Sequence, residues 1–547
     1  MQKFIILVCI TIICGCSSNK KLSETARKDI PFRWENATIY FLLTDRFNNG
    51  NRSNDFKHPK EAAPYRGFMG GDVQGITDKI EDGYFNKLGV DAIWMTPLVE
   101  NITSSVDEGT GISYGFHGYW TKDWTAFDNR IGSKSEIAKM VKTAHENGLR
   151  VIFDVVINHT GPVTPEDTQW PDAWVRTEPT CTYQNYETTT ACTLVKNLPD
   201  IRTESKNEVA LPDFIIEKWK SEGRFESEVA ELDSFFARTN YPRRPYYYII
   251  KWLTDLIRDF GIDGFRVDTV KHIEEDVWKA LYEESLKAHQ DWKLAHPGQL
   301  SEDTKFYMVG EVYNYYAGNG RLFDFGDRKV DYFNYGFDAL INFDFKGDAT
   351  RSYNELFTKY DKLLHGPLQG KSILNYISSH DDGSPFDKRR SKPYEAGTKL
   401  LLTQGAAQIY YGDETARSLA VVASGDASLR SFMNWDEIAE GEKAKVLDHW
   451  QKIGQFRRNH PSVGAGKHFT LNTKPYVFAR KYNDQTIDDM VVCALDVPKG
   501  KKTVPVQVFF NEGSMVRDAY SGIRSKVINA AVEIDTPFDI LLLEVSK

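Results

Sequence analysis

The sequence predicts an α/β fold: a (β/α)₈ TIM barrel with an inserted domain after its third strand and a C-terminal antiparallel β-sandwich. Three observations predict it. From about Trp34, short apolar runs alternate with amphipathic helical stretches, a pattern typical of parallel strands joined by helices. This alternation is interrupted between His159 and Pro242, and it stops after residue 463, where β-rich runs follow. The 547 residues and the 41% hydrophobic content are enough for two or three domains with a sizeable core.

Eight apolar runs are the candidate barrel strands: 38–43, 91–95, 150–157, 262–267, 306–310, 337–343, 372–377 and 407–411. Amphipathic helices are expected between them, for example over 76–88, 134–147, 246–260 and 274–288. β-rich runs follow at 476–481, 489–495, 503–510 and 538–545. The expected domains are therefore a barrel over 34–159 and 243–463, an inserted domain over 160–242 and a sandwich over 464–547. Barrels of this kind carry their chemistry at the C-terminal ends of the strands, so the functional residues are expected there.

The first residues have the pattern of a targeting segment. Lys3 precedes an apolar run, 4–14, that is too short for a stable membrane span, and 1–15 is the predicted signal peptide. A small residue before Cys16 resembles a bacterial lipoprotein cleavage site, which predicts a lipidated Cys16 and a polar tether over 16–33. An ordinary signal peptide with an incidental Cys16 is the alternative. The prediction is a protein of a Gram-negative-type cell envelope, periplasmic or at the outer-membrane surface, that contacts the membrane only through this lipid anchor.

Three of the six cysteines lie beyond the targeting segment. Cys181 and Cys192 are eleven residues apart in a polar stretch, and an oxidising compartment favours a disulfide between them. Cys493 lies in a strand-like run and is expected to be buried rather than reactive. The net charge of −9 argues against a nucleic-acid partner, and we expect a monomer.

The most informative stretch is Gly261–His272, where an apolar run ends in Arg266, Val267 and Asp268. Alternation along a strand places Arg266 and Asp268 on one face. A guanidinium beside a carboxylate keeps it ionised and limits its rotamers, which is what a glycosidase nucleophile needs. The alternative is an aspartate that caps the next helix beside a structural arginine.

Two further carboxylates follow predicted strands, Glu311 after the fifth and Asp381 after the seventh. Glycoside hydrolysis needs one ionised and one protonated carboxyl group, whose environments must differ. Asp268 has Arg266 beside it, whereas Glu311 follows Val309 and Gly310, a less charged setting in which it can keep its proton. The sequence therefore predicts Glu311 as a general acid.

Neutral polar and aromatic residues accompany these carboxylates. His159 emerges from the third strand, where it could bond a sugar hydroxyl, although a lone histidine is more often structural. The cluster 114–120 holds four aromatic residues and suits a platform for a pyranose ring, or simply a packed loop. Asn/Asp-rich residues 44–55 and Gly70–Asp72 offer oxygen ligands for Ca²⁺, although such loops are usually turns.

Together these motifs resemble the α-amylase family, glycoside hydrolase family thirteen. The matching pieces occur in the family's order on the expected strands: 94–97, 154–159, 198–200, 264–272, 310–311, 380–381 and 405–414. The resemblance implies retaining hydrolysis of α-glucosidic bonds, with Asp268 as nucleophile, Glu311 as acid/base and Asp381 as the residue that binds the 2- and 3-hydroxyls. It also implies five substrate-binding residues: Tyr119, His159, Arg266, Lys271 and His380.

The resemblance also implies calcium. One site between barrel and inserted domain maps onto Asn158, Asp200 and the backbone of His272. A second, known in cyclodextrin-forming relatives, maps onto Asn49, Asn51, Asn54, Asp55, Gly70 and Asp72. Asn49 replaces a frequent Asp there, which should weaken the second site. Ser379 stands where chloride-dependent members carry Asn, so no chloride requirement is expected.

Within the family, Lys271-His272 after the nucleophile is typical of enzymes acting on α-1,4 bonds. The stretch 198–204 and the single candidate disulfide resemble the periplasmic α-amylases of Gram-negative bacteria. The expected substrates are starch, glycogen or maltooligosaccharides. A cyclomaltodextrinase, neopullulanase or transglycosylating member remains an alternative, and a non-catalytic glucan-binding lipoprotein is a remote one because all three carboxylates are present.

Overall fold

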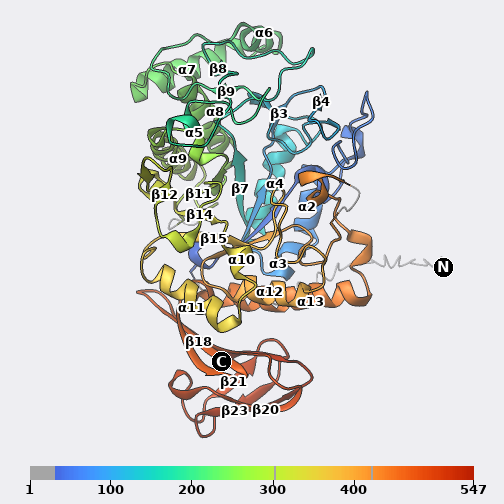
Figure 1. Ribbon diagram of the computed structural model, residues 1–547, viewed down its shortest axis with the longest axis vertical. Helices are drawn as coiled ribbons and strands as arrows, with labels where there is room; N and C mark the ends of the chain where they lie inside the picture. The colour runs from blue at the N-terminus through green and yellow to red at the C-terminus, as the bar shows by residue number, and fades with distance from the viewer. Residues whose placement is uncertain (1–30, 301–303, 420–422, 547) are drawn as a thin grey trace, which may run out of the picture.

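The computed structural model describes residues 31–300, 304–419 and 423–546 (Figure 1). At its centre, eight parallel strands form a closed barrel, in which the first strand pairs with the last. The predicted (β/α)₈ barrel is confirmed, and every strand end lies within two residues of the expected one. The strands are β1 (Thr38–Leu42), β2 (Ala92–Met95), β7 (Arg150–Val155), β10 (Gly264–Val267), β11 (Tyr307–Gly310), β14 (Ala339–Asn342), β15 (Ser372–Tyr376) and β16 (Ala406–Tyr410).

Helices surround the barrel (Figure 1). The expected helix over 76–88 is wrong as a single element, because Gly83 adopts a left-handed conformation (φ 70°) and separates two helices. α9 ends at Ala295, beyond the expected end at residue 288. α4 begins at a capping box made by Ser133 and Glu136. The main helices are α2 (Val73–Glu81), α3 (Tyr84–Leu88), α4 (Lys134–Glu146), α8 (Pro245–Phe260), α9 (Glu275–Ala295), α11 (Tyr353–Leu364), α12 (Pro393–Leu402) and α13 (Gly441–Asn459).

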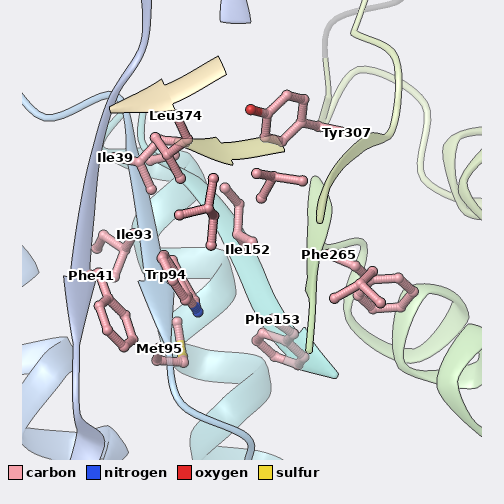
Figure 2. Close-up of a cluster of buried hydrophobic side chains, with 14 of the residues drawn as sticks. Ile39, Phe41, Ile93, Trp94, Met95, Ile152, Phe153, Phe265, Tyr307 and Leu374 are labelled. Carbon is pink, nitrogen blue, oxygen red and sulfur yellow. The ribbon is translucent and has the colours of Figure 1, made fainter. Parts of the chain in front are cut away.

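Large apolar side chains fill the space within and around the barrel strands (Figure 2). Trp94 stacks on Phe41 with 3.8 Å between ring centroids, and both rings are buried. Ile93 and Ile152 are fully buried in neighbouring strands. Because this core is close-packed, the strand ends that carry polar residues have fixed positions.

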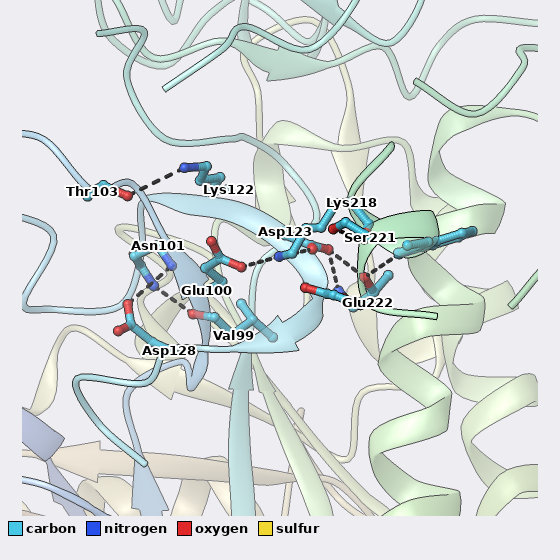
Figure 3. Close-up of polar contacts among 12 residues, drawn as sticks. Val99, Glu100, Asn101, Thr103, Lys122, Asp123, Asp128, Lys218, Ser221 and Glu222 are labelled. Atoms are coloured by element: carbon cyan, nitrogen blue, oxygen red, sulfur yellow. Dashed lines mark hydrogen bonds and ion pairs between the residues drawn. The ribbon is translucent and has the colours of Figure 1, made fainter. Parts of the chain in front are cut away.

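Two connections at the C-terminal ends of the barrel strands are long and contain secondary structure of their own. The segment after β7 contains β8 (Val175–Arg176), α5 (Glu187–Thr190), β9 (Asp200–Ile201), α6 (Asp213–Ser221) and α7 (Phe225–Thr239), which lie at the top of Figure 1. The loop after β2 folds into a small sheet of β3 (Val99–Asn101) and β6 (Thr121–Phe127), which the sequence did not predict. Lys218 of α6 contacts both Glu100 and Asp123 of this sheet (Figure 3). Cys181 and Cys192 form a disulfide within the segment after β7.

The C-terminal residues form two antiparallel sheets that share an apolar core. A six-stranded sheet has the order β17-β18-β19-β24-β21-β22, and β20 pairs with β23. The strand expected over 503–510 is wrong in its second half, because β20 ends at Pro505 and a 3₁₀ turn follows. The strands are β17 (Lys467–Thr473), β18 (Tyr476–Asn483), β19 (Asp488–Leu495), β20 (Gly500–Pro505), β21 (Met515–Asp518), β22 (Arg524–Lys526), β23 (Ala531–Thr536) and β24 (Ile540–Val545). Cys493 is buried in β19 as a free thiol, as expected.

The described chain enters at the opposite end of the barrel from the elaborated loops. Trp34 stacks on Tyr307, the first residue of β11, with centroids 4.1 Å apart. Arg33 pairs with Asp484, after β18, at 2.8 Å. None of the helices in the described ranges has both the length and the apolar character that crossing a membrane requires. The predicted signal peptide, lipidated Cys16 and most of the tether lie outside the described residues.

Candidate active site

A cavity of about 650 Å³ opens at the C-terminal ends of the barrel strands. Asp268 follows β10, Glu311 follows β11 and Asp381 follows β15, and all three line this cavity. The structure thus brings together the three carboxylates that the sequence singled out. Most of the expected substrate-binding residues line it too, namely Tyr119, His159, Lys271 and His380, whereas Arg266 lies beneath it with only 1% of its surface exposed.

Arg266 connects the carboxylates from below. Its Nη1 lies 2.6 Å from Asp268 Oδ1 and 2.9 Å from Asp154 Oδ1, and its Nη2 lies 3.2 Å from Glu311 Oε2. The pairing of Arg266 with Asp268 follows the strand alternation seen in the sequence. Asp268 does not cap the next helix, because the residue before α9 is Glu274. Its carboxylate is therefore held by a buried cation and directed to the cavity.

Glu311 is the carboxyl group most suited to carry a proton. Burial raises its pKa from 4.5 to about 8, although the neighbouring Arg266 acts in the opposite direction. Its Oε2 accepts a hydrogen bond of 3.0 Å from the main-chain N–H of Thr269, which fixes the side chain. At neutral pH this group is mostly protonated and can act as a general acid.

Asp381 has a different environment. Its side chain is 39% exposed, because it faces the open cavity. Burial acts to raise its pKa, but the neighbouring His380, Arg430 and Arg266 outweigh that effect and lower it. Ser379 Oγ donates to Asp381 Oδ1 at 3.2 Å. Asp381 is therefore an ionised acceptor for ligand hydroxyl groups at neutral pH.

Tyr119 forms part of the cavity floor. Its hydroxyl donates to Asp154 Oδ2 at 2.7 Å, and its ring stacks on His380 with centroids 5.3 Å apart. Burial lowers the pKa of His380 to about 4, so its imidazole is neutral at pH 7 and can donate or accept a hydrogen bond. The aromatic ring of Tyr119, which lines the cavity, offers a face on which a sugar ring can stack.

Lys271 lies on the Glu311 side of the cavity. Its Nζ donates to the main-chain oxygen of Tyr313 at 3.2 Å, and the rings of Tyr183 and Tyr313 lie 5.5 and 5.3 Å from it. Burial lowers the pKa of this ammonium group. His159 also lines the cavity, and burial lowers its pKa, which keeps it neutral. This side therefore combines aromatic faces with hydrogen-bond donors.

Comparison with known proteins identifies the family. The profile described as "Alpha amylase, catalytic domain" matches residues 41–460. The chain belongs to the α-amylase family. It is 34% identical over 535 residues to the periplasmic α-amylase of Escherichia coli (strain K12), covering 86% of this chain and 74% of that one. It is 26% identical to a cyclomaltodextrinase of Thermoanaerobacter pseudethanolicus, covering 84% of this chain and 71% of the other.

Solved structures agree on the fold. An Anoxybacillus α-amylase superposes with a TM-score of 0.67 at 23% identity, covering 94% of this chain and 100% of that one. The α-amylase of Geobacillus thermoleovorans in complex with acarbose gives a TM-score of 0.66 at 21% identity, with coverages of 94% and 100%. As a member of the α-amylase family, the chain is a glycosidase of the α-amylase type.

The first calcium site implied by the α-amylase family has a donor set that fits a cation. Asn158 Nδ2 donates to Asp200 Oδ2 at 3.1 Å, so both residues meet between barrel and inserted segment. Asp200 Oδ1 is buried and lacks any hydrogen-bond partner within the described chain. Burial raises the pKa of Asp200 to about 7. A buried carboxylate oxygen without a partner is costly, and a bound cation would supply one. The main chain of His272 belongs to the adjacent turn. The ring Nδ1 of His272 lies 3.0 Å from the main-chain oxygen of Thr189.

The second implied site fits calcium only in part. Asn49 Nδ2 donates to Asp55 Oδ1 at 2.8 Å above Gly70, where a Cβ would lie 2.5 Å from Asn49. The amide oxygens of Asn49 and Asn54 are buried without a hydrogen-bond partner in the described residues, which fits a cation. Asp72, in contrast, caps α2 and accepts from the N–H groups of Gly50, Asn51 and Gly75, and Asn51 bonds Ser53 and Glu136.

Neither implied site is a cluster of acidic side chains. In the described part of the chain, no group of three or more histidine, cysteine, aspartate or glutamate residues is arranged to hold a metal. Any calcium would therefore rely on amide and main-chain oxygens together with one or two carboxylates.

Two residues of the site, Asp154 and Arg430, were not predicted from the sequence as functional residues. Asp154 accepts hydrogen bonds from Trp94, Tyr119 and Arg266, and its presence inside an apolar parallel strand was a usable signal, because a buried charge needs partners. Arg430 also lines the cavity, and its Nε donates to the main-chain oxygen of His380 at 2.9 Å. Arg430 lies in the irregular stretch after β16, where no periodicity marks it.

Proposed function

We propose that the protein hydrolyses α-1,4-glucosidic bonds in starch, glycogen or maltooligosaccharides with retention of anomeric configuration. One observation carries the proposal: a buried Glu311 with a pKa of about 8 shares a cavity with Asp268, which Arg266 holds at 2.6 Å. Retaining glycosidases need this difference between two neighbouring carboxyl groups, one protonated and one ionised.

In the first step, Asp268 attacks the anomeric carbon while Glu311 protonates the departing glycosidic oxygen. The product is a β-glucosyl ester of Asp268 and a free sugar chain. In the second step, ionised Glu311 removes a proton from water, which attacks the anomeric carbon and releases Asp268. Asp381, ionised and open to the cavity, binds the 2- and 3-hydroxyls more tightly in the transition state than in the ground state.

The remaining residues of the site bind and orient the sugar. Tyr119 stacks under the ring at the cleavage point, and the neutral imidazoles of His159 and His380 bond its hydroxyls. Arg266 orients Asp268 from below. Lys271, beside Glu311, binds the part of the substrate that leaves.

Calcium would be bound between barrel and inserted domain by Asn158, Asp200 and the main chain of His272. When bound, it would supply a partner for the Oδ1 atom of Asp200 and tie the two segments together. A second ion would be held by Asn49, Asn54, Asp55 and the main chain of Gly70. Asp72 and Asn51, already engaged with the main chain and neighbouring side chains, would contribute less.

We propose the domain boundaries as barrel 34–159 and 243–463, inserted domain 160–242 and sandwich 464–547. The similarity to a periplasmic α-amylase supports a periplasmic location. A lipid anchor at Cys16 and a monomeric state complete the proposal. The similarity to a cyclomaltodextrinase keeps a cyclodextrin-cleaving or transglycosylating activity as the second candidate.

Product analysis tests the proposal. Soluble starch, pullulan and γ-cyclodextrin are each incubated with the protein, and products are separated over time, with the new anomer followed by proton NMR. Maltooligosaccharides in the α configuration from starch, with pullulan untouched, are the expected result. Panose or maltose from pullulan and cyclodextrin would favour the second candidate. β-Products, or unchanged activity in Asp268→Asn, would refute the mechanism.

A further inference from the structure

Two adjacent aspartates follow β15, and their carboxylates lie in different surroundings. Asp381 lines the cavity, and its side chain is 39% exposed. The side chain of Asp382 is only 11% exposed, and among the described residues Asp382 is not one of those that line the cavity. A substrate in the cavity therefore touches Asp381 but not Asp382, and any role of Asp382 in the reaction must act through its neighbours.

Three donors hold the Asp382 carboxylate. The Tyr376 hydroxyl donates to Asp382 Oδ2 at 2.7 Å, and the ammonium group of Lys346 pairs with the same oxygen. Asp382 Oδ1 accepts a hydrogen bond of 3.1 Å from the main-chain N–H of Ser384. Burial and the nearby Asp382 raise the pKa of Tyr376, so its hydroxyl keeps the proton that it donates. Tyr376 ends β15, whereas Lys346 lies in α10 (Phe345–Asp348), after β14, so the carboxylate is tied to two neighbouring strands.

Asp381 stands on a loop, 377–386, that is attached on both sides. A main-chain hydrogen bond of 2.9 Å joins the two ends of this loop. Toward β16, Ser378 Oγ donates to both carboxylate oxygens of Asp413 at 2.6 Å. Toward β14, Asp382 makes the ion pair with the lysine of α10. Asp381 therefore lies between two attachment points that are only four positions apart in the sequence.

The closest partners of the Asp381 carboxylate move with it. Ser379 Oγ donates to its Oδ1 at 3.2 Å, and His380 Nε2 lies 3.6 Å from its Oδ2. Both residues belong to the same loop, so these contacts would not oppose a shift of the loop as a whole. A functional carboxylate must be held within about 0.5 Å of its productive place. Contacts that reach outside the loop must supply this precision, and Asp382 makes such contacts directly beside Asp381.

We propose that Asp382, fixed by Lys346 and Tyr376, is a positioning residue for Asp381. The inference rests on the proposed function, in which Asp381 binds sugar hydroxyls more tightly in the transition state than in the ground state. If the contacts of Asp382 are broken, the loop can move, and the transition state loses more binding than the substrate does. The expected signature is a fall in kcat with little change in KM.

The substitution Lys346→Met tests the proposal, because it removes the ammonium group and keeps an unbranched side chain. With maltoheptaose, kcat should fall about 10- to 100-fold and KM should change by less than about threefold, since a small misplacement of a functional group is costly. Lys346→Arg retains the charge and should keep kcat within about threefold of that of the unaltered protein. The inhibition constant of acarbose, whose unsaturated ring is flattened like the sugar ring in the transition state, should rise in proportion to the loss of kcat/KM.

A matched control separates positioning from a general loss of stability. Lys122 is also a partly exposed lysine, 28% exposed, and it pairs with the buried Asp167 at 3.1 Å. Neither of these two is among the described residues that line the cavity. Lys122→Met should lower Tm about as much as Lys346→Met does, but leave kcat and the inhibition constant unchanged. If calorimetry shows that Lys346→Met is unfolded, Tyr376→Phe takes its place, with an expected loss in kcat of about tenfold.

A double-mutant cycle tests whether Lys346 acts through Asp381. In the Asp381→Ala variant, the residue to be positioned is absent, so adding Lys346→Met should lower kcat by less than about twofold. A full further loss in that background would overturn the proposal. An unchanged kcat in folded Lys346→Met, or a loss that falls on KM alone, would overturn it as well. Near-complete activity of Asp381→Ala by itself would instead refute the proposed role of Asp381 and, with it, this inference.

Discussion

Replacement of Glu311 by glutamine should lower activity and raise stability, with both effects depending on pH. The folded protein raises the pKa of this carboxyl from 4.5 to about 8, so it binds the proton more tightly than the unfolded chain does. The stabilisation that the protonated Glu311 carboxyl contributes is fully present below pH 4.5 and is lost as pH rises through 8. At about 1.36 kcal/mol per pKa unit, the ionisable carboxyl costs on the order of 3 kcal/mol at pH 7 and about 5 kcal/mol at pH 9.

Glu311→Gln removes this cost because a carboxamide cannot ionise. With an unfolding entropy of about 2.1 cal/mol/K per residue over the whole chain, Tm should rise by about 4 °C at pH 9 and by less than about 1 °C at pH 5. Turnover of starch should fall by about 10²- to 10⁴-fold, since the general acid is lost. In the unaltered protein, kcat/KM should decrease above about pH 8 as Glu311 loses its proton.

Calorimetry at pH 5, 7 and 9 measures Tm. The rate of reaction with maltosyl fluoride measures how fast the glucosyl-enzyme forms when the leaving group needs no proton. Fluoride leaves without a proton, so Glu311→Gln should still form the glucosyl-enzyme from this substrate. Asp381→Asn is the matched control, because the pKa of that carboxyl is lowered and the substitution should not raise Tm at high pH. A Tm gain in Glu311→Gln that is equal at pH 5 and pH 9 would refute the reasoning.

Three further predictions concern buried charges. Arg266→Lys should lose the contacts to several carboxylates at once. The free energy of unfolding, measured by calorimetry, should fall by about 3–5 kcal/mol, and kcat, measured by kinetics, should fall as well. A chelator should lower Tm of the unaltered protein by a few degrees (about 2–5 °C), and in Asp200→Asn this effect should largely disappear; an unchanged Tm would argue against structural calcium. His460 lies between Asp489 and Glu544 of the C-terminal sheet, at 2.8 and 2.6 Å, and these carboxylates raise its pKa despite burial. Its stabilising contribution is present below pH 6.5 and lost as pH rises through the folded pKa, so the Tm difference between the unaltered protein and His460→Gln should shrink from pH 6 to pH 9.

The barrel was predictable because each of its strands is apolar and separated from the next by a helix. Periodicity gave their positions within two residues. It did not show the break at Gly83, because an isolated glycine inside a helical pattern is compatible with both continuation of the helix and a turn. It also missed the β3–β6 sheet, whose strands pair Glu100 with Asp123 and lack clear alternation.

The carboxylates of the site were predictable because each lies shortly after the C-terminal end of an apolar strand. Asp268 and Glu311 follow β10 and β11 directly, and Asp381 comes five positions after the end of β15. The ion pairs that Arg66 forms with Glu108 and Asp426 beside the cavity were not predictable, because they join residues far apart in sequence. Arg66 and Asp426 are separated by 360 positions and lie in irregular loops. The aromatic cluster was predictable only in part, since Phe116, Tyr119 and Trp120 line the cavity whereas Tyr114 is buried, with 1% of its surface exposed.

The described chain begins at the end of the barrel opposite the cavity. Trp34 and Arg33 fasten the start of the described chain to the first residue of β11 and to the C-terminal sheet. This is the pole of the barrel remote from the cavity. If the protein is attached through the proposed lipid on Cys16, the cavity therefore opens on the side of the barrel away from the attachment point. Long glucan chains would then reach the cavity directly from the surrounding fluid, and released fragments would diffuse away from the membrane.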